Sequence, residues 1–208
     1  MQIIIRPFNH EDIPEIVNLH LKYLSTHFCT RPHSVKLLSL YYQSLSEAGQ
    51  ISYVAEVNGK MAGYICVLLS PKAIYLYQIK NHFFTSLLNF SAMIGCKFCH
   101  NAAVNLKFFW GRMKGLLTRN RQASDISQQP NGLPELRPIV VRPEFQGTSV
   151  ARTLLAAVEN DLLARGIFRY YLWVENYNLR AMNFYRKSGF VVKEEKGNVY
   201  VFMEKSLT

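Results

Sequence analysis

The middle of this 208-residue chain has no acidic residues: neither Asp nor Glu occurs between Val57 and Ser124. That stretch contains nine of the chain's 24 Lys and Arg residues, while all 14 Asp and Glu residues lie outside it. The formal net charge of +10 therefore belongs almost entirely to one segment, and the rest of the chain is nearly neutral. The nine basic residues are Lys60, Lys72, Lys80, Lys97, Lys107, Arg112, Lys114, Arg119 and Arg121.

The chain also has no long apolar run and no secretory signal pattern. Its first residues, MQIIIRPFNHED, lack a basic segment followed by an apolar one. The longest uncharged apolar run, near Phe83–Cys96, is interrupted by polar residues and is too short to span a bilayer. These absences predict a cytoplasmic protein in which the four cysteines are reduced.

The composition is that of a folded protein, since 49% of the residues are hydrophobic and only 18% are charged. The length suits one domain with a substantial core, or one domain with an insertion. We therefore expect a single domain over residues 1–208, with an atypical basic helical insertion at about 72–132.

Hydrophobic periodicity and turn residues predict an alternation of helices and strands outside that insertion. Asn9, with Asp12 three residues later, is expected to cap the first helix, and Asn58-Gly59 is expected to turn a hairpin. The predicted strands are 2–6, 51–57, 61–69, 135–141, 168–174, 191–194 and 199–203. The predicted helices are 9–27, 34–48, 149–165 and 179–188.

The basic insertion has helical spacing over 76–90 and 98–117, with apolar residues gathered on one face. Lys, Arg and aromatic residues on amphipathic helices fit contact of residues 72–118 with a membrane surface. They also fit a homodimer face or a lid over a substrate pocket. Nucleic acid is a less favoured partner, because no stacking-platform motif accompanies the charge.

The last third of the chain contains a pattern that suits phosphate binding. The apolar strand predicted at 135–141 leads through the loop RPEFQGTS into an amphipathic helix. Unpaired N–H groups at the start of a helix, beside the positive end of its dipole, attract phosphate. Gly147 would allow the backbone to approach such a ligand closely. This pattern alone is also compatible with an ordinary connection between a strand and a helix.

A second motif follows, and the two together resemble the GCN5-related N-acetyltransferase (GNAT) family. Gln146 to Ala151 follow the family's Gln/Arg-x-x-Gly-x-Gly/Ala signature, with Ser149 where glycine is usual. The segment Asn178–Phe190 follows Asn-x-x-Ala-x-x-Phe-Tyr-x-x-x-Gly-Phe at every fixed position. The resemblance implies an α/β (α+β) fold, the GNAT fold. Its central sheet is mixed, mostly antiparallel, splayed between the fourth and fifth strands and flanked by helices.

The resemblance also implies the cosubstrate, acetyl-CoA, and the residues that hold it, with no metal required. The backbone of the fourth strand would bind the pantetheine arm and the acetyl carbonyl, and Pro138 and Pro143 fit a bulged or splayed strand there. Asn178 would contact the pantetheine arm. The implied cofactor-binding residues are Ile139, Val140, Val141, Gln146, Gly147, Thr148, Ser149, Val150, Ala151 and Asn178.

Two residues are candidates for proton transfer in acetyl transfer to an amine. Resemblance gives Tyr185 the role of protonating the departing CoA sulfur, which a phenol with a pKa near ~10 could do at neutral pH. Resemblance gives Glu135, at the start of the fourth strand, the role of general base, and the amine needs one because it must lose a proton before it attacks. Glu56, Glu175 and His27 are the alternative bases.

The expected function is that of an enzyme with an unidentified amine acceptor. The alternative is a GNAT-fold binding module that uses its basic insertion for membrane-surface or nucleic-acid association. Residues 96–100, CKFCH, spell a haem-attachment motif, but without an export signal they are interpreted as buried free thiols and not as a metal site.

Overall fold

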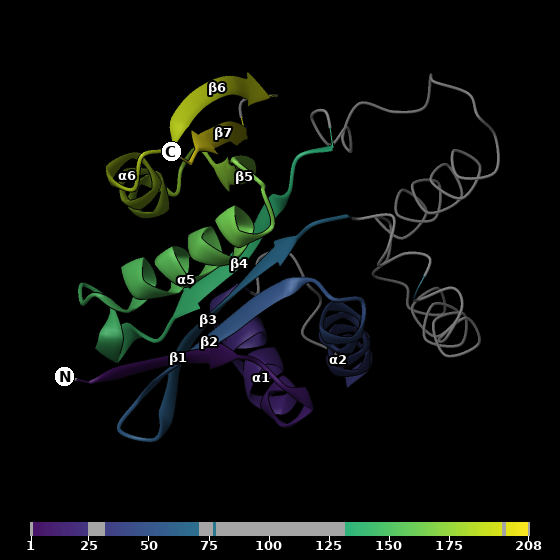
Figure 1. Cartoon of the computed structure of the whole chain (residues 1–208). Helices are drawn as coiled ribbons and strands as arrows, with labels where there is room; N and C mark the ends of the chain where they lie inside the picture. The colour runs from purple at the N-terminus through teal and green to yellow at the C-terminus, as the bar shows by residue number, and fades with distance from the viewer. Residues whose placement is uncertain (1, 25–31, 71–76, 78–131, 197–198, 208) are drawn as a thin grey trace, which may run out of the picture.

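The structure, a computed structural model, describes residues 2–24, 32–70, 77, 132–196 and 199–207 (Figure 1). The predicted basic insertion, apart from residues 77 and 132, lies outside these residues, as do the CKFCH motif and His27. Among the described residues, no helix is long and apolar enough to cross a membrane.

A seven-stranded sheet forms the centre of the molecule, in the order β1-β2-β3-β4-β5-β7-β6. Every neighbouring pair is antiparallel except β4 and β5, which are parallel. The mixed, mostly antiparallel sheet expected from the sequence is confirmed. The strands are β1 (Ile3–Pro7), β2 (Ile51–Val57), β3 (Lys60–Leu68), β4 (Glu135–Val141), β5 (Arg169–Glu175), β6 (Val191–Lys196) and β7 (Tyr200–Ser206).

Helices cover both faces of the sheet (Figure 1). Helices α1 and α2 pack on one face, and α5 crosses β1–β4 on the other. The helices are η1 (His10–Asp12), α1 (Ile13–Tyr23), α2 (Pro32–Glu47), η3 (Pro143–Phe145), α5 (Val150–Ala164) and α6 (Leu179–Lys187).

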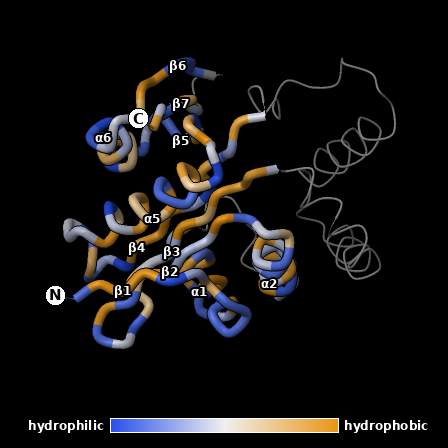
Figure 2. Tube along the Cα trace, viewed as in Figure 1, coloured by the Kyte–Doolittle hydropathy of each residue, from blue (hydrophilic) through white to orange (hydrophobic). Residues whose placement is uncertain are grey.

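The two faces of the sheet have separate hydrophobic cores because side chains alternate along each strand. On β2, Val54 belongs to the core under α1 and α2, and its neighbour Ala55 belongs to the core under α5. On β3, Tyr64 and Ile65 divide in the same way. Figure 2 shows the hydrophobic residues following the strands, with hydrophilic residues on the outer side of α6.

The predicted N-terminal cap is present, although the helix after it is not a single α-helix. Asn9 accepts a hydrogen bond from the N–H of Glu11 at 3.0 Å, and its own N–H donates to the Asp12 carboxylate at 2.8 Å. These bonds hold the 3-10 turn η1, and α1 begins only after it, with Pro14 in its first turn.

Two C-terminal strands are longer than their sequence pattern indicates. β6 reaches Lys196 and β7 reaches Ser206, where predictions ended at Glu194 and Met203. β7 pairs with β5 along its whole length, from Arg169 opposite Ser206 to Glu175 opposite Tyr200. Charged residues are therefore kept in strand conformation by pairing, which local propensity does not predict.

Candidate active site

The sheet opens between β4 and β5, where a ligand can reach its interior. These strands pair only at Glu135 opposite Tyr171, near the start of β4, and an N–H of Tyr171 donates to the carbonyl of Pro134 at 3.0 Å. Both strands run parallel away from this point and separate. The opening therefore widens toward Val141 and Glu175, at the carboxyl ends of the two strands.

Pro138 lies at an irregularity of β4, as the sequence predicted. Ile65 of β3 faces Ile139, but Val67 faces Leu136, so β4 contains one extra residue between them. A proline cannot donate a backbone hydrogen bond, so it is accommodated at such a bulge more easily than in a regular central strand.

Beyond the bulge, two backbone N–H groups of β4 face the opening. The N–H of Arg142 donates to the carbonyl of Ala62 on β3 at 2.9 Å. Because the direction of backbone groups alternates along a strand, the N–H groups of Ile139 and Val141 point away from β3, toward the side of β5. Val140 differs from these two: its backbone faces Tyr64 of β3, and its side chain is buried under α1 and α2.

The loop after β4 brings the predicted phosphate-binding residues to the start of α5. Gly147 has a φ of 82°, a conformation that favours glycine, whereas Ser149 has a φ of −76°. The serine that replaces the usual glycine therefore causes no backbone strain. Thr148 holds the turn through a hydroxyl bond to the carbonyl of Phe145 at 2.6 Å.

The first turn of α5 is only partly capped, by a bond from the N–H of Val150 to the hydroxyl of Thr148 at 3.4 Å. Ser149 makes no side-chain capping bond, and the first backbone bond of the helix runs from Thr153 to the carbonyl of Ser149 at 2.9 Å. Within the described residues, the N–H groups of Gly147, Ala151 and Arg152 have no hydrogen-bond partner. These donors, beside the positive end of the helix dipole, fit a phosphate group.

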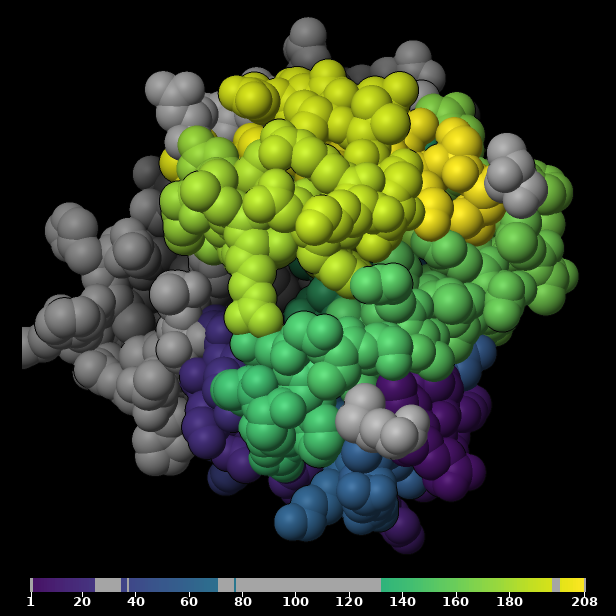
Figure 3. Space-filling view, turned by 90° about the vertical axis from the view of Figure 1, so that its left-hand side faces the viewer, coloured from purple at the N-terminus to yellow at the C-terminus, as the bar shows by residue number. Residues whose placement is uncertain are grey.

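A chain of side chains crosses the opening at this end. Gln146 donates from its amide nitrogen to the carbonyl of Val141 at 3.0 Å, and its amide oxygen accepts a bond from Arg180 in α6. Figure 3 shows α6, in yellow-green, meeting the green segment that follows β4. Sequence reasoning missed Arg180, since only its position within the Asn178–Phe190 motif could have indicated a role.

Tyr185, the candidate acid, lies in α6 with only 7% of its surface exposed. Its ring packs against those of Phe184 and Phe190, each with a centroid distance of 5.4 Å. Burial raises the pKa of Tyr185 well above that of an exposed tyrosine, so the phenol keeps its proton at neutral pH.

Glu135, the candidate base, lies where β4 and β5 meet. Its carboxylate pairs with Arg137 at 3.0 Å and accepts a bond from the hydroxyl of Tyr171 at 3.3 Å. Burial, with the charge of Glu135 next in importance, raises the pKa of Tyr171. The structure thus places Glu135 at the narrow end of the opening and Gln146 with α5 at its wide end.

Part of the chain is similar to a known family. Residues 111–190 match the model of the acetyltransferase (GNAT) family. A stretch of 71 residues is 30% identical to the spermidine N(1)-acetyltransferase of Thermoplasma acidophilum. That alignment covers 34% of this chain and 44% of the relative, so the chain matches less than half of the relative's length.

Solved structures with the same fold match nearly the whole chain. The PaiA N-acetyltransferase of Thermoplasma acidophilum, in complex with coenzyme A, has a TM-score of 0.56 at 17% identity over 99% of each chain. YncA of Salmonella typhimurium, with acetyl-CoA, has a TM-score of 0.59 at 14% identity, over 99% of this chain and 94% of its own. The chain therefore has the GNAT fold, and its residues 111–190 are similar to the GNAT family.

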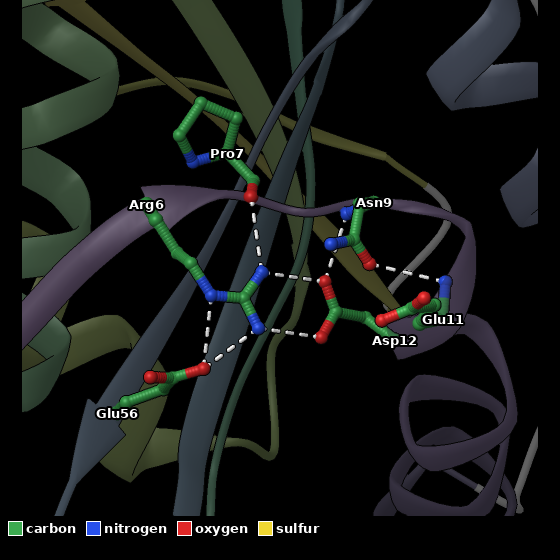
Figure 4. Close-up of polar contacts among 6 residues, drawn as sticks. All are labelled: Arg6, Pro7, Asn9, Glu11, Asp12 and Glu56. Carbon is green, nitrogen blue, oxygen red and sulfur yellow. Dashed lines mark hydrogen bonds and ion pairs between the residues drawn. The ribbon is translucent and has the colours of Figure 1, made fainter. Parts of the chain in front are cut away.

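The other predicted site residues have structural roles in this fold. The side chain of Asn178 caps α6 by accepting a bond from the N–H of Ala181 at 3.1 Å. Glu56, an alternative base, is bound by Arg6 at 2.6 and 2.9 Å in a network with Asp12 (Figure 4). Glu175, the other described alternative, ends β5 at the wide side of the opening.

Arg142 is a second residue of this GNAT fold that sequence reasoning missed. Its side chain donates to the carbonyl of Met61 at 2.7 Å and pairs with Glu15 of α1. Together with its backbone bond to Ala62, these contacts fix the end of β4 to β3 and to α1. A pocket beside these contacts is lined by Glu15, Lys60, Met61, Arg142, Glu144 and Phe145.

Proposed function

We propose that this protein is an acetyl-CoA-dependent N-acetyltransferase that moves an acetyl group directly to a primary amine. The observation that carries this proposal is the opening between β4 and β5, which ends at the first turn of α5 with its unpaired N–H groups. One part of the opening offers the N–H groups of Ile139 and Val141, and the other offers the N–H groups of Gly147, Ala151 and Arg152.

The described residues fit acetyl-CoA. The N–H groups around Gly147 and at the start of α5 suit its pyrophosphate, and those of Ile139 and Val141 suit the amides of its pantetheine arm and the thioester oxygen. When bound, acetyl-CoA supplies an activated acetyl group. Asn178, beside the wide end of the opening, would contact the pantetheine arm.

In this proposal two residues move the protons. Glu135 accepts a proton from the acceptor ammonium, directly or through water, so that the neutral amine can attack. As the new C–N bond forms and the C–S bond breaks, Tyr185 donates its proton to the sulfur. The phenol of Tyr185 is protonated at neutral pH, as a proton donor must be.

The acceptor is proposed to be a small amine. The T. acidophilum relative is named for acetylation of spermidine, a small molecule with primary amines. A reaction that consumes acetyl-CoA also fits the cytoplasmic location expected from the sequence.

Calorimetry with acetyl-CoA tests the proposal through two matched variants. Gly147 and Gly166 both have positive φ, 82° and 71°, and a Cβ at either position meets no atom within 4 Å. Gly147→Ala and Gly166→Ala should therefore be strained to a similar extent, by about 1–2 kcal/mol. We expect only Gly147→Ala to weaken acetyl-CoA binding. Failure of the wild-type protein to bind acetyl-CoA would contradict the proposed function.

A further inference from the structure

An exposed cluster of aromatic and apolar side chains surrounds the end of β5. Tyr177 and Leu179, between β5 and α6, are 64% and 65% exposed, and Tyr200, at the start of β7, is 40% exposed. Side chains of this kind are usually more buried, so their gathering at one place indicates a contact surface.

The cluster is held together around a carboxylate. Glu175 and Tyr200 are direct cross-strand neighbours on β5 and β7. The interaction with Glu175 raises the pKa of Tyr177, and the N–H of Asn176 donates to the carbonyl of Val199 at 2.9 Å. The β5–α6 connection and the start of β7 are thus tied to each other, which positions both phenol rings beside Glu175.

The cluster lies on the face of the sheet opposite α5. Tyr170, Leu172 and Val174 of β5 point into the core under α5, so Trp173 and Glu175 point the other way. The same alternation places Tyr200 and Phe202 of β7 on this second face, and the rings of Trp173 and Phe202 lie 5.0 Å apart.

This second face is the side from which an acceptor can approach. The proposed cofactor donors are at the start of α5, and Tyr185 packs into the core that α5 covers. Glu135 does not point into that core; its carboxylate contacts Tyr171, which precedes Trp173 by two residues and shares its face. Glu135 and Glu175 therefore mark the narrow and the wide end of the opening on one face.

Two phenol rings beside a carboxylate form an environment that favours a cation. The negative faces of aromatic rings attract ammonium groups, and a nearby carboxylate adds charge complementarity. Leu179 and Val199 beside them offer apolar surface to a hydrocarbon chain. A neutral or anionic acceptor would gain nothing from this combination.

We propose that Glu175, Tyr177 and Tyr200 form a subsite for a second positive charge on the acceptor, which is therefore a linear diamine or polyamine. This inference rests on the proposed function. Tyr171, opposite Glu135, and Glu175 are four residues apart on β5, which corresponds to about 13 Å along the strand. An acceptor whose reacting amine lies within the opening needs an extended chain to place its other ammonium at Glu175.

Matched amines test the subsite. Diaminooctane and octylamine have the same chain and reacting amine, and differ only in the distal ammonium. We expect the wild-type protein to have a KM for diaminooctane lower by about three- to fivefold, since a charge contact at an exposed site has an effect of about this size. Shorter diamines, down to putrescine, should have progressively higher KM values.

Substitutions show which residues cause the lower KM for diaminooctane. Glu175→Gln and Tyr177→Ala should each remove most of the preference for diaminooctane, and Tyr177→Ala should leave the KM for octylamine unchanged. Glu11→Gln removes one carboxylate from the exposed turn before α1 and is the matched control, which should keep the full preference. Thermal melting checks that each variant is folded; Tyr177, on an exposed connection, is the substitution least damaging to the fold.

The outcomes separate this inference from the proposed function. Equal KM values for the two amines, or a preference that survives both substitutions, would overturn the subsite and leave acetyl transfer intact. Calorimetric binding of the two amines gives a second readout that does not need turnover. If the protein neither binds acetyl-CoA nor acetylates octylamine, the proposed function fails, and tighter binding of diaminooctane than of octylamine would still support the subsite.

Discussion

The ring of Tyr185 is deeply buried, and a substitution can remove its hydroxyl without removing the ring. It packs between Phe184 and Phe190, and no hydrogen bond involves its hydroxyl within the described residues. Tyr185→Phe should therefore leave stability and acetyl-CoA binding nearly unchanged. Removal of a proton donor that acts in the transition state should lower kcat by about 10²–10⁴-fold. An unchanged kcat in single-turnover measurements would show that the ring only contributes to packing.

Glu135 can be tested independently of Tyr185. Glu135→Gln keeps hydrogen-bonding groups near Arg137 and Tyr171 but cannot accept the amine's proton. We expect kcat/KM to fall at neutral pH and to recover partly as the pH rises, because the amine then loses its proton without help. A pH–rate profile identical to that of the wild-type protein would point to another base, and Glu175 is the described alternative.

The network of Arg6, Asp12 and Glu56 predicts a pH-dependent contribution to stability (Figure 4). Burial alone would raise the pKa of Asp12, but bonds from Arg6 and from the N–H of Asn9 outweigh it, and the pKa is lowered. A carboxyl with a lowered pKa stabilises the fold above its unfolded-state pKa, and this stabilisation disappears as the pH falls through its folded-state pKa.

Asp12→Asn should accordingly lower the free energy of unfolding at neutral pH by about 1–2 kcal/mol, since Arg6 is partly exposed and solvent screens the pair. Asn keeps an oxygen for the N–H of Asn9, so the turn before α1 should persist. Urea unfolding of both proteins should give curves that converge near about pH 3. A difference that stays constant with pH would attribute the effect to packing instead of charge.

At the scale of the elements, the position of β4 depends on how closely β3 approaches it. A Cβ on Gly63 would lie 2.3 Å from the carbonyl oxygen of Val140 and 3.1 Å from the Cα of Val141. Gly63→Ala must therefore push the two strands apart, at a cost of about 1–3 kcal/mol or more. Because Ile139 and Val141 move with β4, acetyl-CoA affinity should fall as well.

Gly59→Ala provides the comparison for Gly63→Ala. Gly59 is in the turn between β2 and β3, and a Cβ there meets nothing within 4 Å, although its φ of 73° makes alanine strained. Urea unfolding should show a loss of stability for both variants, and calorimetry should show weaker acetyl-CoA binding only for Gly63→Ala. Equal affinities would mean that the spacing of β3 and β4 does not control the proposed site.

The elements that the sequence predicted best are those with strong local signals. The strands at 51–57 and 135–141 have the predicted bounds, because an Asn-Gly turn follows the first and an apolar pattern with two prolines marks the second. The bulge at Pro138 was predictable because proline lacks an N–H group. The contacts of Arg142 and Arg180 were not, because they join segments distant in the sequence and depend on the completed fold.

At the scale of the whole molecule, a buried polar chain joins both helices of one face to the sheet. His20 of α1, Tyr42 of α2 and Tyr64 of β3 are linked by contacts of 2.7 and 2.8 Å through the hydroxyl of Tyr42. A buried hydroxyl that loses its partner destabilises a fold, so this chain favours one relative position of α1, α2 and β3. It contributes to the rigidity of the β1–β4 half, against which the opening is formed.

The basic segment between Val57 and Ser124 determines the electrostatic behaviour of the molecule, and the sequence alone carries this prediction. Apolar surfaces as large as those of its aromatic residues must be covered. We propose that a second copy of the chain covers them, with the positive charges around the covered patch. The aromatic residues are Phe83, Phe84, Phe108, Phe109 and Trp110.

Like charges that face each other across such an interface repel, and salt screens this repulsion while it leaves the burial of apolar surface intact. Light scattering should therefore give a larger share of dimer at high salt than at low salt. Anionic vesicles distinguish self-association from membrane binding. If the segment binds membranes, the protein should bind the vesicles at low salt and dissociate from them as salt is added. A monomer at both salt concentrations that also ignores vesicles would contradict self-association and leave packing against the protein's own core as the way these side chains are covered.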